Sequence, residues 1–234
     1  MRVLVTRHDV DARETAARLA ALGHEALVAP LIAINFLDGP EVDLAGVQAF
    51  LATSSNGVRA LARRSPERHL PLFAVGRQTA RTARELGFVA VKDFDGDAMA
   101  LADFVSTAVP AGSGLLLHAT AREASGALAE ALTKRGFRVR RENIYETPAV
   151  EILPAIVGDA LRARRLDAVL LFSARSAEVF RERVREAGLS LSCRSLKAFC
   201  ISKACADALA PLGFSHVSIA AAPNQDALLA LLGP

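Results

Sequence analysis

Short apolar segments alternate with amphipathic segments along the whole chain, and glycine follows most of the amphipathic ones. Residues 2–7 (RVLVTR) predict a strand, residues 11–22 predict a helix that Gly23 ends, and residues 25–30 predict the next strand. The same alternation continues to the end of the chain. It is typical of α/β folds built on parallel sheets, and we predict such a fold here.

Two of the predicted helix starts carry a capping-box pattern. Asp11 is followed by Glu14, and Thr120 at the end of the apolar segment 114–120 is followed by Glu123. In this pattern the first side chain accepts from a backbone N–H of the first turn, and the acidic side chain reaches back. We therefore expect helices to begin at Asp11 and Thr120.

These strand and helix units repeat. Residues 72–91 resemble residues 198–217, so that Phe73 corresponds to Phe199 and Gly87 to Gly213, both 126 positions apart. The opening unit matches the unit that ends at Gly136, 113 positions after Gly23. The order of the units is a, b, a′, b′, which indicates duplication of one α/β fold.

Two extended segments, 30–38 and 143–152, follow the two related first units. Two similar connectors predict a two-stranded β ladder by which the chain leaves one domain and returns to it. We then expect a discontinuous domain, 1–34 plus 149–234, and an inserted domain, 35–148, with a cleft between them. Two domains formed by successive halves of the chain are the alternative.

Small polar residues stand at the ends of the predicted strands. In open parallel sheets, ligands bind beyond the carboxyl ends of the strands, where helix N-termini present unpaired N–H groups. A single serine or threonine at such a place is also an ordinary helix N-cap, and that interpretation stays open for each. Together they predict a cleft that binds carboxylates. The segments are 53–57, 76–79, 120–122, 173–176 and 202–203.

The composition, 52% hydrophobic and 23% charged, is that of a globular protein. A net charge of +3, without a block of Lys and Arg interleaved with aromatics, argues against nucleic-acid binding. No apolar run is long enough to span a bilayer, and charged residues interrupt the start of the chain, so we expect neither membrane insertion nor a signal peptide. Cys193, Cys200 and Cys205 lack metal or CxxC spacing, which favours the reducing cytoplasm.

Known catalytic patterns are missing. The five histidines are scattered, so no metal site is expected, and GxGxxG, P-loop and GxSxG motifs do not occur. His118 ends an apolar strand, where a capping or partly buried role is expected. Asp93, Asp95 and Asp97 alternate without the Glu of a calcium loop and predict a turn and a helix cap. Tyr145, the single tyrosine, lies on the return connector, either facing the cleft as a hydrogen-bonding group or as a half-exposed strand residue.

The chain resembles the uroporphyrinogen-III synthase family over essentially its whole length. The resemblance is carried by the order and spacing of VLVTR, VAPLIAI, LATSSNGVRAL, FAVGRQTARTARELGF, NIYETP, DAVLLFSARSAEVF and KACADALAPLGF. It implies two α/β domains joined by a two-stranded ladder, no metal and no organic cofactor. It also implies a lyase reaction in heme, siroheme and cobalamin biosynthesis.

In that reaction the linear hydroxymethylbilane loses water and closes to uroporphyrinogen III with ring D inverted. The substrate passes through an azafulvene and a spiro intermediate, so the enzyme must chiefly hold eight carboxylates in the right geometry. The resemblance makes Tyr145 the candidate for assisting departure of the hydroxyl group. We also expect a monomer, to which hydroxymethylbilane synthase hands over the substrate transiently.

The resemblance and the strand-end positions together predict a set of substrate-binding residues. The family's second glycine-rich turn reads CISKACA here, with Ser202 in place of Gly and Cys205 in place of Thr. An alternative function is a two-domain protein that binds a small anion or tetrapyrrole, or regulates, with the same fold. The predicted substrate-binding residues are Thr6, Arg7, Ser54, Asn56, Gly57, Gly76, Thr79, Thr120, Arg122, Ser173, Ser176, Ser202 and Lys203.

Overall fold

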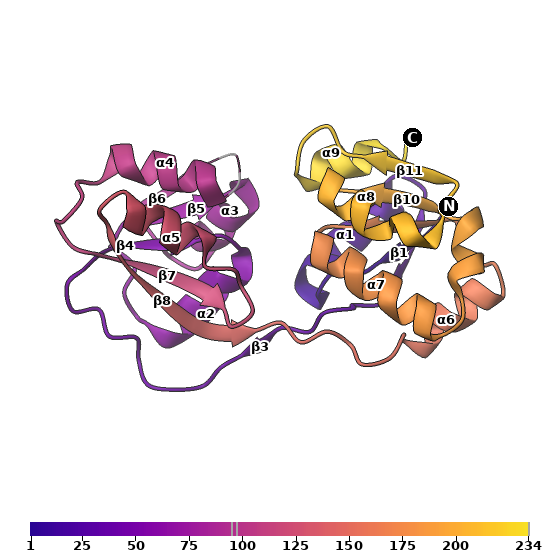
Figure 1. Cartoon of the computed structure of the whole chain (residues 1–234), viewed down its shortest axis with the longest axis horizontal. Coiled ribbons are helices and arrows are strands. Elements are labelled where there is room, and N and C mark those ends of the chain that lie inside the picture. The colour runs from indigo at the N-terminus through magenta and orange to yellow at the C-terminus, as the bar shows by residue number, and fades with distance from the viewer. Residues whose placement is uncertain (95, 97, 234) are drawn as a thin grey trace. The chain divides into compact units, whose positions relative to one another are not determined.

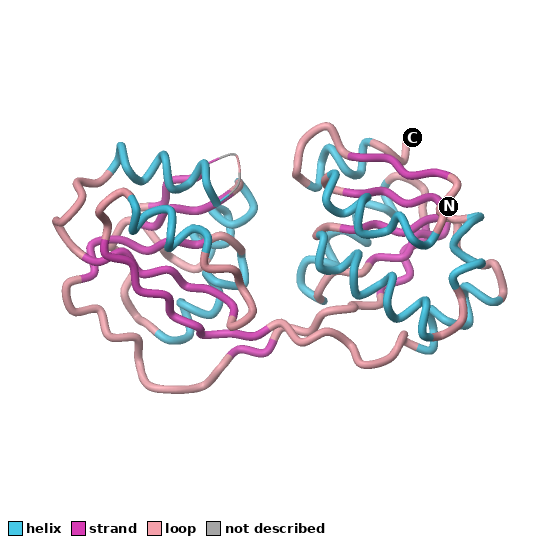
Figure 2. The backbone as a smooth tube through the Cα atoms, in the orientation of Figure 1, coloured by secondary structure: helices cyan, strands magenta, loops and turns pink. Residues whose placement is uncertain are grey.

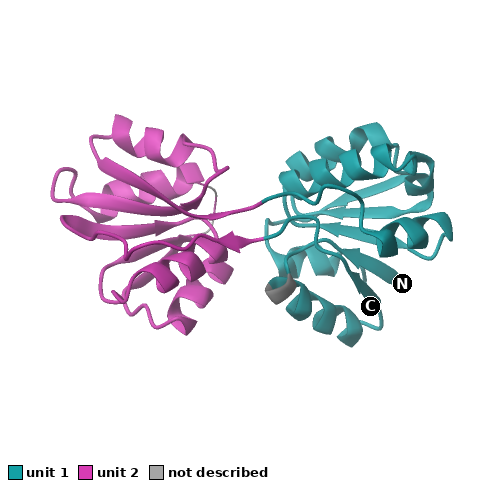
Figure 3. Cartoon of the chain, turned by 90° about the horizontal axis from the view of Figure 1, so that it is seen from below, with its two compact units in different colours: residues 1–33, 148–234 teal, residues 34–147 magenta. Residues whose placement is uncertain are grey.

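The computed structural model describes residues 1–94, 96 and 98–233, so Asp95 and Asp97 and the turn and cap expected there lie outside the described residues. The chain divides into two compact units (Figure 3). Unit 1 comprises residues 1–33 and 148–234, and unit 2 comprises residues 34–147. Each division falls one residue before the limit expected from the sequence.

Unit 1 contains a parallel sheet with the strand order β11-β10-β9-β1-β2 (Figure 1). Helices cover both of its faces. The strands are β1 (Arg2–Val5), β2 (Glu25–Val28), β9 (Ala168–Leu171), β10 (Lys197–Cys200) and β11 (His216–Ile219). The helices are α1 (Asp9–Ala21), α6 (Ala155–Arg162), α7 (Ala174–Glu186), α8 (Lys203–Leu209) and α9 (Gln225–Ala230), with 3₁₀ turns at Ser190–Ser195 and Ala210–Leu212.

Unit 2 contains a sheet with the order β3-β8-β7-β4-β5-β6, parallel except for the antiparallel β3 (Figure 1). The strands are β3 (Asn35–Phe36), β4 (Val47–Ala52), β5 (Leu72–Val75), β6 (Val91–Phe94), β7 (Leu115–Ala121) and β8 (Arg138–Glu146). The helices are α2 (Ser55–Arg64), α3 (Arg77–Glu85), α4 (Ala98–Ala108) and α5 (Ala127–Lys134).

The parallel strands of the two sheets have the same spatial order, although the chain passes through them in a different succession. Numbered from β1 in unit 1 and from β7 in unit 2, both run 2-1-3-4-5, because β2-β1-β9-β10-β11 corresponds to β8-β7-β4-β5-β6. In such sheets the connections diverge to opposite faces at the boundary between the first and third strands. The switch points, where ligands bind in open α/β sheets, therefore lie between β1 and β9 in unit 1 and between β7 and β4 in unit 2.

Each sheet is a buried middle layer, as near-continuous apolar strands require. In unit 1 one face packs on α6, α7 and α8 and the other on α1 and α9. In unit 2 one face packs on α2 and α3 and the other on α4 and α5. Strand residues such as Leu4, Leu51 and Leu117 are fully buried, because helices cover the sheet on both sides.

The two connectors pair as antiparallel strands, as predicted. In unit 2, β3 pairs with the end of β8 (Figure 2). Phe36 lies opposite Tyr145 in this pairing. In unit 1, Ile32 forms a bridge with Ala149, and the Ala33 N–H donates to the Pro148 carbonyl at 2.9 Å. None of the helices within the described residues combines the length and apolar character needed to cross a membrane.

Both capping-box predictions are wrong. Helix α1 begins at Asp9 after the cap residue His8, so Asp11 lies within the first turn and pairs with Arg7 instead. Strand β7 continues through Thr120 to Ala121, and α5 begins only at Ala127. In the second case a tertiary partner determines the chain path, since pairing with β8 extends β7 beyond the local signal.

Only the last residue of the apolar segment 88–91 (FVAV) belongs to a strand. Strand β6 begins at Val91, which lies opposite Leu72 of β5. Phe88 instead packs into the core of unit 2 with its ring against Phe50. Register with the neighbouring strand thus overrides the apolar pattern.

Candidate active site

Ser54 forms the N-terminal cap of α2 at the switch point of unit 2. Its backbone is extended, and its Oγ accepts the N–H of Gly57 at 3.1 Å, so one orphan donor of the helix is satisfied. Strand β4 ends at Ala52, so Ser54 lies at the carboxyl edge of the sheet. The cap therefore holds a hydroxyl at the place where open α/β sheets bind ligands.

Tyr145 lies beside this cap. The Tyr145 ring is buried in the apolar cluster between the sheet and α2, with only 6% of the residue exposed, and its Oη lies 2.9 Å from Ser54 Oγ. The β7–β8 register shifts here, so that Thr120 lies opposite Asn143 and Ala121 opposite Tyr145. Ile144 is the additional residue of this bulge, and both Ile144 and Tyr145 pack on the same face of the sheet.

The surroundings of Tyr145 keep its hydroxyl protonated. Burial raises the pKa of the phenol, the nearby Glu123 carboxylate raises it further, and the hydrogen bond to Ser54 opposes both effects. At neutral pH the group is a neutral hydroxyl with a proton to donate. The arrangement is suited to hydrogen bonding or proton donation at the edge of the sheet.

Gly57, in the first turn of α2, lies against strand β7. A Cβ at this position would lie 2.6 Å from the carbonyl oxygen of Ala119, closer than van der Waals contact allows. The absence of a side chain therefore lets α2 approach the sheet closely. Gly57 serves packing and offers its N–H to Ser54 Oγ, a role that the sequence pattern did not reveal.

We expect Gly57→Ala to destabilise unit 2 by about 1–2 kcal/mol. Overpacking against a backbone atom costs about 1–3 kcal/mol, and the better helix propensity of alanine returns up to about 1 kcal/mol. Gly158→Ala in α6 is the matched control, because its Cβ would meet only the mobile end of Arg162 at 3.3 Å. Thermal unfolding followed by circular dichroism should show a lower midpoint for Gly57→Ala alone. Equal midpoints for the two variants would contradict the close approach.

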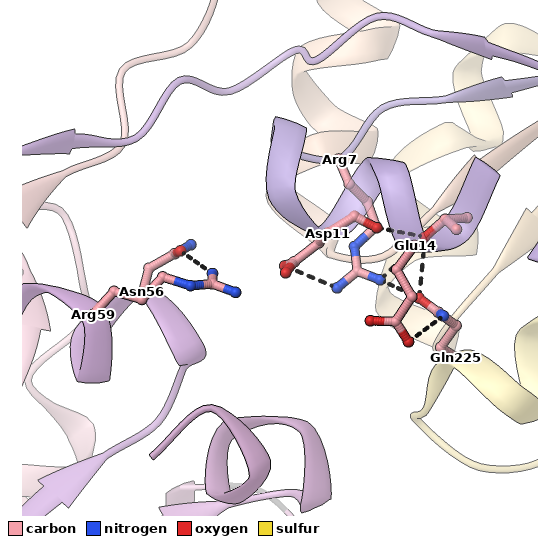
Figure 4. Close-up of polar contacts among 7 residues, drawn as sticks. Arg7, Asp11, Glu14, Asn56, Arg59 and Gln225 are labelled. Atoms are coloured by element: carbon pink, nitrogen blue, oxygen red, sulfur yellow. Dashed lines mark hydrogen bonds and ion pairs between the residues drawn. The ribbon is translucent and has the colours of Figure 1, made fainter. Parts of the chain in front are cut away.

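Asn56 follows the cap on α2 and accepts from Arg59 Nη1 at 2.8 Å (Figure 4). Arg122 at the end of β7 pairs with Glu146 on β8 at 2.9 Å, and Glu146 also accepts from Asn35 of β3. Arg122 thus lies at the same edge as Ser54 and ties the loop after β7 to the connector.

Glu123 anchors the connector at its next residue. Glu123 Oε2 accepts both the N–H and the hydroxyl of Thr147 at 3.0 Å. Together with the Arg122–Glu146 pair, this contact holds the segment that carries Tyr145. No sequence pattern predicted the contact of Glu123 with Thr147, because Glu123 was interpreted as part of a capping box.

Three of the predicted hydroxyl residues are buried within their units. Thr6 donates to the Leu170 carbonyl at 3.0 Å, and Thr120 lies in β7 with 1% of its surface exposed. Thr79 is buried in α3, whose cap residue Gly76 has φ 78°, a conformation that glycine adopts without strain. Gly76 lies at the end of β5, one strand away from the switch point.

In unit 1, Arg7 leaves the end of β1 and joins a polar cluster (Figure 4). Its guanidinium lies 4.2 Å from the Phe172 ring centroid, pairs with Asp11 at 3.1 Å and donates to Gln225 of α9. Glu14 accepts from Gln225 at 3.5 Å in the same cluster. These contacts fix the guanidinium of Arg7 at the switch point of unit 1.

Ser173 caps α7 at the other side of this switch point. Its Oγ accepts the N–H of Ser176 at 3.0 Å and lies 2.8 Å from the Ser176 Oγ. Ser202 caps α8 by accepting the Cys205 N–H at 3.4 Å, and exposed Lys203 pairs with Asp207 at 2.8 Å. Caps at Ser54 and Ser173 thus have the same geometry in corresponding places of the two sheets.

His118 is buried rather than at a strand end. It lies in the middle of β7 with 3% of the residue exposed, and its Nε2 lies 3.5 Å from Thr53 Oγ1. Burial lowers the pKa of its imidazole to about 4, with a contribution from the neighbouring Arg141. Among the described residues, no three His, Cys, Asp or Glu side chains are grouped so as to hold a metal.

Comparisons with known proteins agree with this geometry. The family model described as uroporphyrinogen-III synthase HemD matches residues 13–230. The chain belongs to the uroporphyrinogen-III synthase family. Members of this family are cyclising lyases of tetrapyrrole biosynthesis, and the function expected from the sequence is confirmed over the alternative of a binding or regulatory protein.

Two solved structures of uroporphyrinogen-III synthases share the fold. The synthase from Helicobacter pylori has a TM-score of 0.67 at 18% identity, covering 99% of this chain and 98% of its own. A mutant synthase from the extremely thermophilic bacterium Thermus thermophilus has a TM-score of 0.59 at 22% identity, covering 99% and 96%. Comparison with curated protein sequences gave no match.

Proposed function

We propose that this synthase dehydrates and cyclises hydroxymethylbilane to uroporphyrinogen III, and that the carboxyl edges of both sheets bind the substrate. The observation that supports the proposal most directly is the buried Tyr145 hydroxyl held beside the Ser54 cap at the switch point of unit 2. It provides a protonated donor next to the N-terminus of a helix. Such a donor accelerates a reaction in which hydroxide leaves as water.

The first step is loss of water. Tyr145 donates its proton to the hydroxyl of the hydroxymethyl group, the carbon–oxygen bond breaks, and electrons from the pyrrole nitrogen form the azafulvene. The substituted carbon of ring D then attacks the methylene carbon to give the spiro intermediate. In the spiro intermediate the bond between ring D and the methylene carbon of ring C then breaks, and ring D joins that methylene carbon through its unsubstituted α carbon, which inverts the ring. The phenolate of Tyr145 takes the proton that this α carbon loses as the macrocycle closes.

The carboxylates of the substrate are held by N–H groups and cations at the sheet edges. Helix N-termini at Ser54 and Ser173 carry partial positive charge, and Arg7, Arg122 and Lys203 extend from the same edges. Asp11, Glu146 and Asp207 now pair with these three cations and would exchange with substrate carboxylates. The remaining proposed contacts are Thr6, Asn56, Gly57, Gly76, Thr79, Thr120, Ser176 and Ser202.

We also propose a cytoplasmic monomer that receives hydroxymethylbilane from its synthase without a cofactor. The three cysteines are buried and free, which suits a reducing compartment. Burial raises the pKa of the Cys193 and Cys200 thiols to about 12, so neither is a nucleophile at neutral pH. Light scattering after gel filtration measures the mass in solution, and a monomer has 24.7 kDa. A mass of about twice this value would contradict the monomer.

The product isomer tests the proposed function. Hydroxymethylbilane made freshly by its own synthase is incubated with and without the protein, oxidised and separated by chromatography. Unassisted closure gives the symmetric type I isomer, so a predominance of type III only with the protein is the expected result. Type I in both samples, from a protein shown to be folded, would contradict the proposal and indicate binding without chemistry.

A further inference from the structure

We propose that Ser54 is a positioning residue for Tyr145: its hydroxyl donates to the phenol oxygen and stabilises the phenolate that forms as Tyr145 releases its proton. The inference rests on the proposed function of Tyr145 as the proton donor. It assigns Ser54 a role in the chemical step, in place of a role in holding substrate.

The other contact of Ser54 leaves its hydroxyl proton free for this hydrogen bond, and we take Ser54 as the donor. Ser54 Oγ accepts the N–H of Gly57 at 3.1 Å, so one of its lone pairs is already used. The hydroxyl proton of Ser54 still needs an acceptor, and the oxygen of Tyr145 lies 2.9 Å away. With Ser54 as donor, the proton of Tyr145 remains available to the leaving group.

Helix α2 adds to the same effect. Ser54 immediately precedes α2, which is ten residues long, and no acidic residue stands in its first turn. The positive end of the helix dipole therefore faces the site where negative charge develops. A phenolate formed beside Ser54 would be stabilised by the helix end as well as by the hydroxyl.

The bulge in β8 makes the contact possible. In a regular strand, successive side chains point to opposite faces, and Ile144 and Tyr145 would be separated by the sheet. The additional residue at Ile144 places both on the face covered by α2, within reach of Ser54. Arg122 and Glu123 then bind the following residues, Glu146 and Thr147, so the chain is held immediately after the bulge.

The composition of the chain makes the test direct. Tyr145 is the single tyrosine and there is no tryptophan, so tyrosinate absorbance near 295 nm and tyrosine fluorescence both report Tyr145 alone. We would titrate the wild type and Ser54→Ala, Ser54→Gly and Ser54→Thr without substrate. Glycine is a good N-cap and alanine is a poor one, so Ser54→Gly separates the hydrogen bond from the cap.

We expect Ser54→Ala and Ser54→Gly to raise the titration midpoint of Tyr145 by about one pH unit, because a donor to the phenolate is lost. We expect kcat to fall about tenfold with KM nearly unchanged. Ser54→Thr retains the hydroxyl, so its Tyr145 titration midpoint and its kcat should match those of the wild type. If a variant unfolds at high pH, the ¹³Cζ chemical shift of labelled Tyr145, measured at pH 8, reports the same hydrogen bond.

Two results would overturn the inference. A midpoint and ¹³Cζ shift that stay unchanged in Ser54→Gly would show that Ser54 does not donate to Tyr145. A raised KM with an unchanged kcat would return Ser54 to substrate binding. Asn224→Ala, which removes the cap of α9 in unit 1, is the control for loss of a cap and should leave the Tyr145 titration unchanged. The titration needs no substrate, so it stands apart from the isomer assay.

Discussion

Replacing Tyr145 by Phe is expected to lower kcat about 100-fold while the fold is retained. General acid catalysis contributes about 10²–10⁴-fold, and the lower end applies because hydroxymethylbilane also loses its hydroxyl without assistance. The phenyl ring keeps its place in the apolar cluster of unit 2, since only the hydroxyl reaches Ser54. Loss of this hydrogen bond costs about 1 kcal/mol of stability.

Steady-state kinetics with isomer analysis measures this effect. Slow enzymatic turnover lets unassisted closure compete, so the fraction of type I product should rise in the variant. Circular dichroism at neutral pH should match that of the wild type. Unchanged specific activity in a folded Tyr145→Phe protein would remove Tyr145 from the mechanism and leave positioning by the whole site as the source of catalysis.

Acidification is expected to destabilise unit 2 through His118. The imidazole is held neutral in the native state with a pKa of about 4, whereas in the unfolded chain its pKa is the ordinary 6.5. Below pH 6.5 the unfolded state binds a proton that the native state excludes, so the stability present above pH 6.5 is lost as the pH falls toward 4. The loss is about 2 kcal/mol at pH 5 and about 3 kcal/mol at pH 4.

Urea unfolding at pH 7 and pH 5, followed by the fluorescence of Tyr145, measures unit 2 selectively. The His118→Leu variant carries no titrating group at this position. Its free energy of unfolding should therefore fall by about 2 kcal/mol less between pH 7 and pH 5 than that of the wild type. Groups such as Glu67 and Asp93, whose lowered pKa values come from local hydrogen bonds, act equally in both proteins and cancel. His118→Gln is the second variant if Leu does not fold, and equal pH dependence would contradict the buried neutral imidazole.

Much of the architecture follows from the sequence, because its signals are local. Strand and helix alternate in the predicted order, and helices α1, α3 and α8 with its 3₁₀ extension end before Gly23, Gly87 and Gly213, each of which has positive φ. The two extended connectors pair as antiparallel strands. Serines at strand ends predicted helix caps, and Ser54, Ser173 and Ser202 are the caps of α2, α7 and α8.

The tertiary structure decided the rest. Asp11 and Thr120 carry correct cap patterns, yet α1 begins at Asp9 and β7 continues past Thr120. In β7, pairing with β8 across the sheet outweighs a cap worth about 1 kcal/mol. The burial of His118 depends on the helices that cover the sheet from elsewhere in the chain.

The contact of Tyr145 with Ser54 joins residues 91 positions apart and requires a bulge that has no local sequence signal. The sequence by itself determined the order of the elements, the glycines at which helices end and the polar residues that follow the strands. Which of those residues meet was decided only by strand register and helix packing, since these depend on long-range contacts that no local pattern encodes.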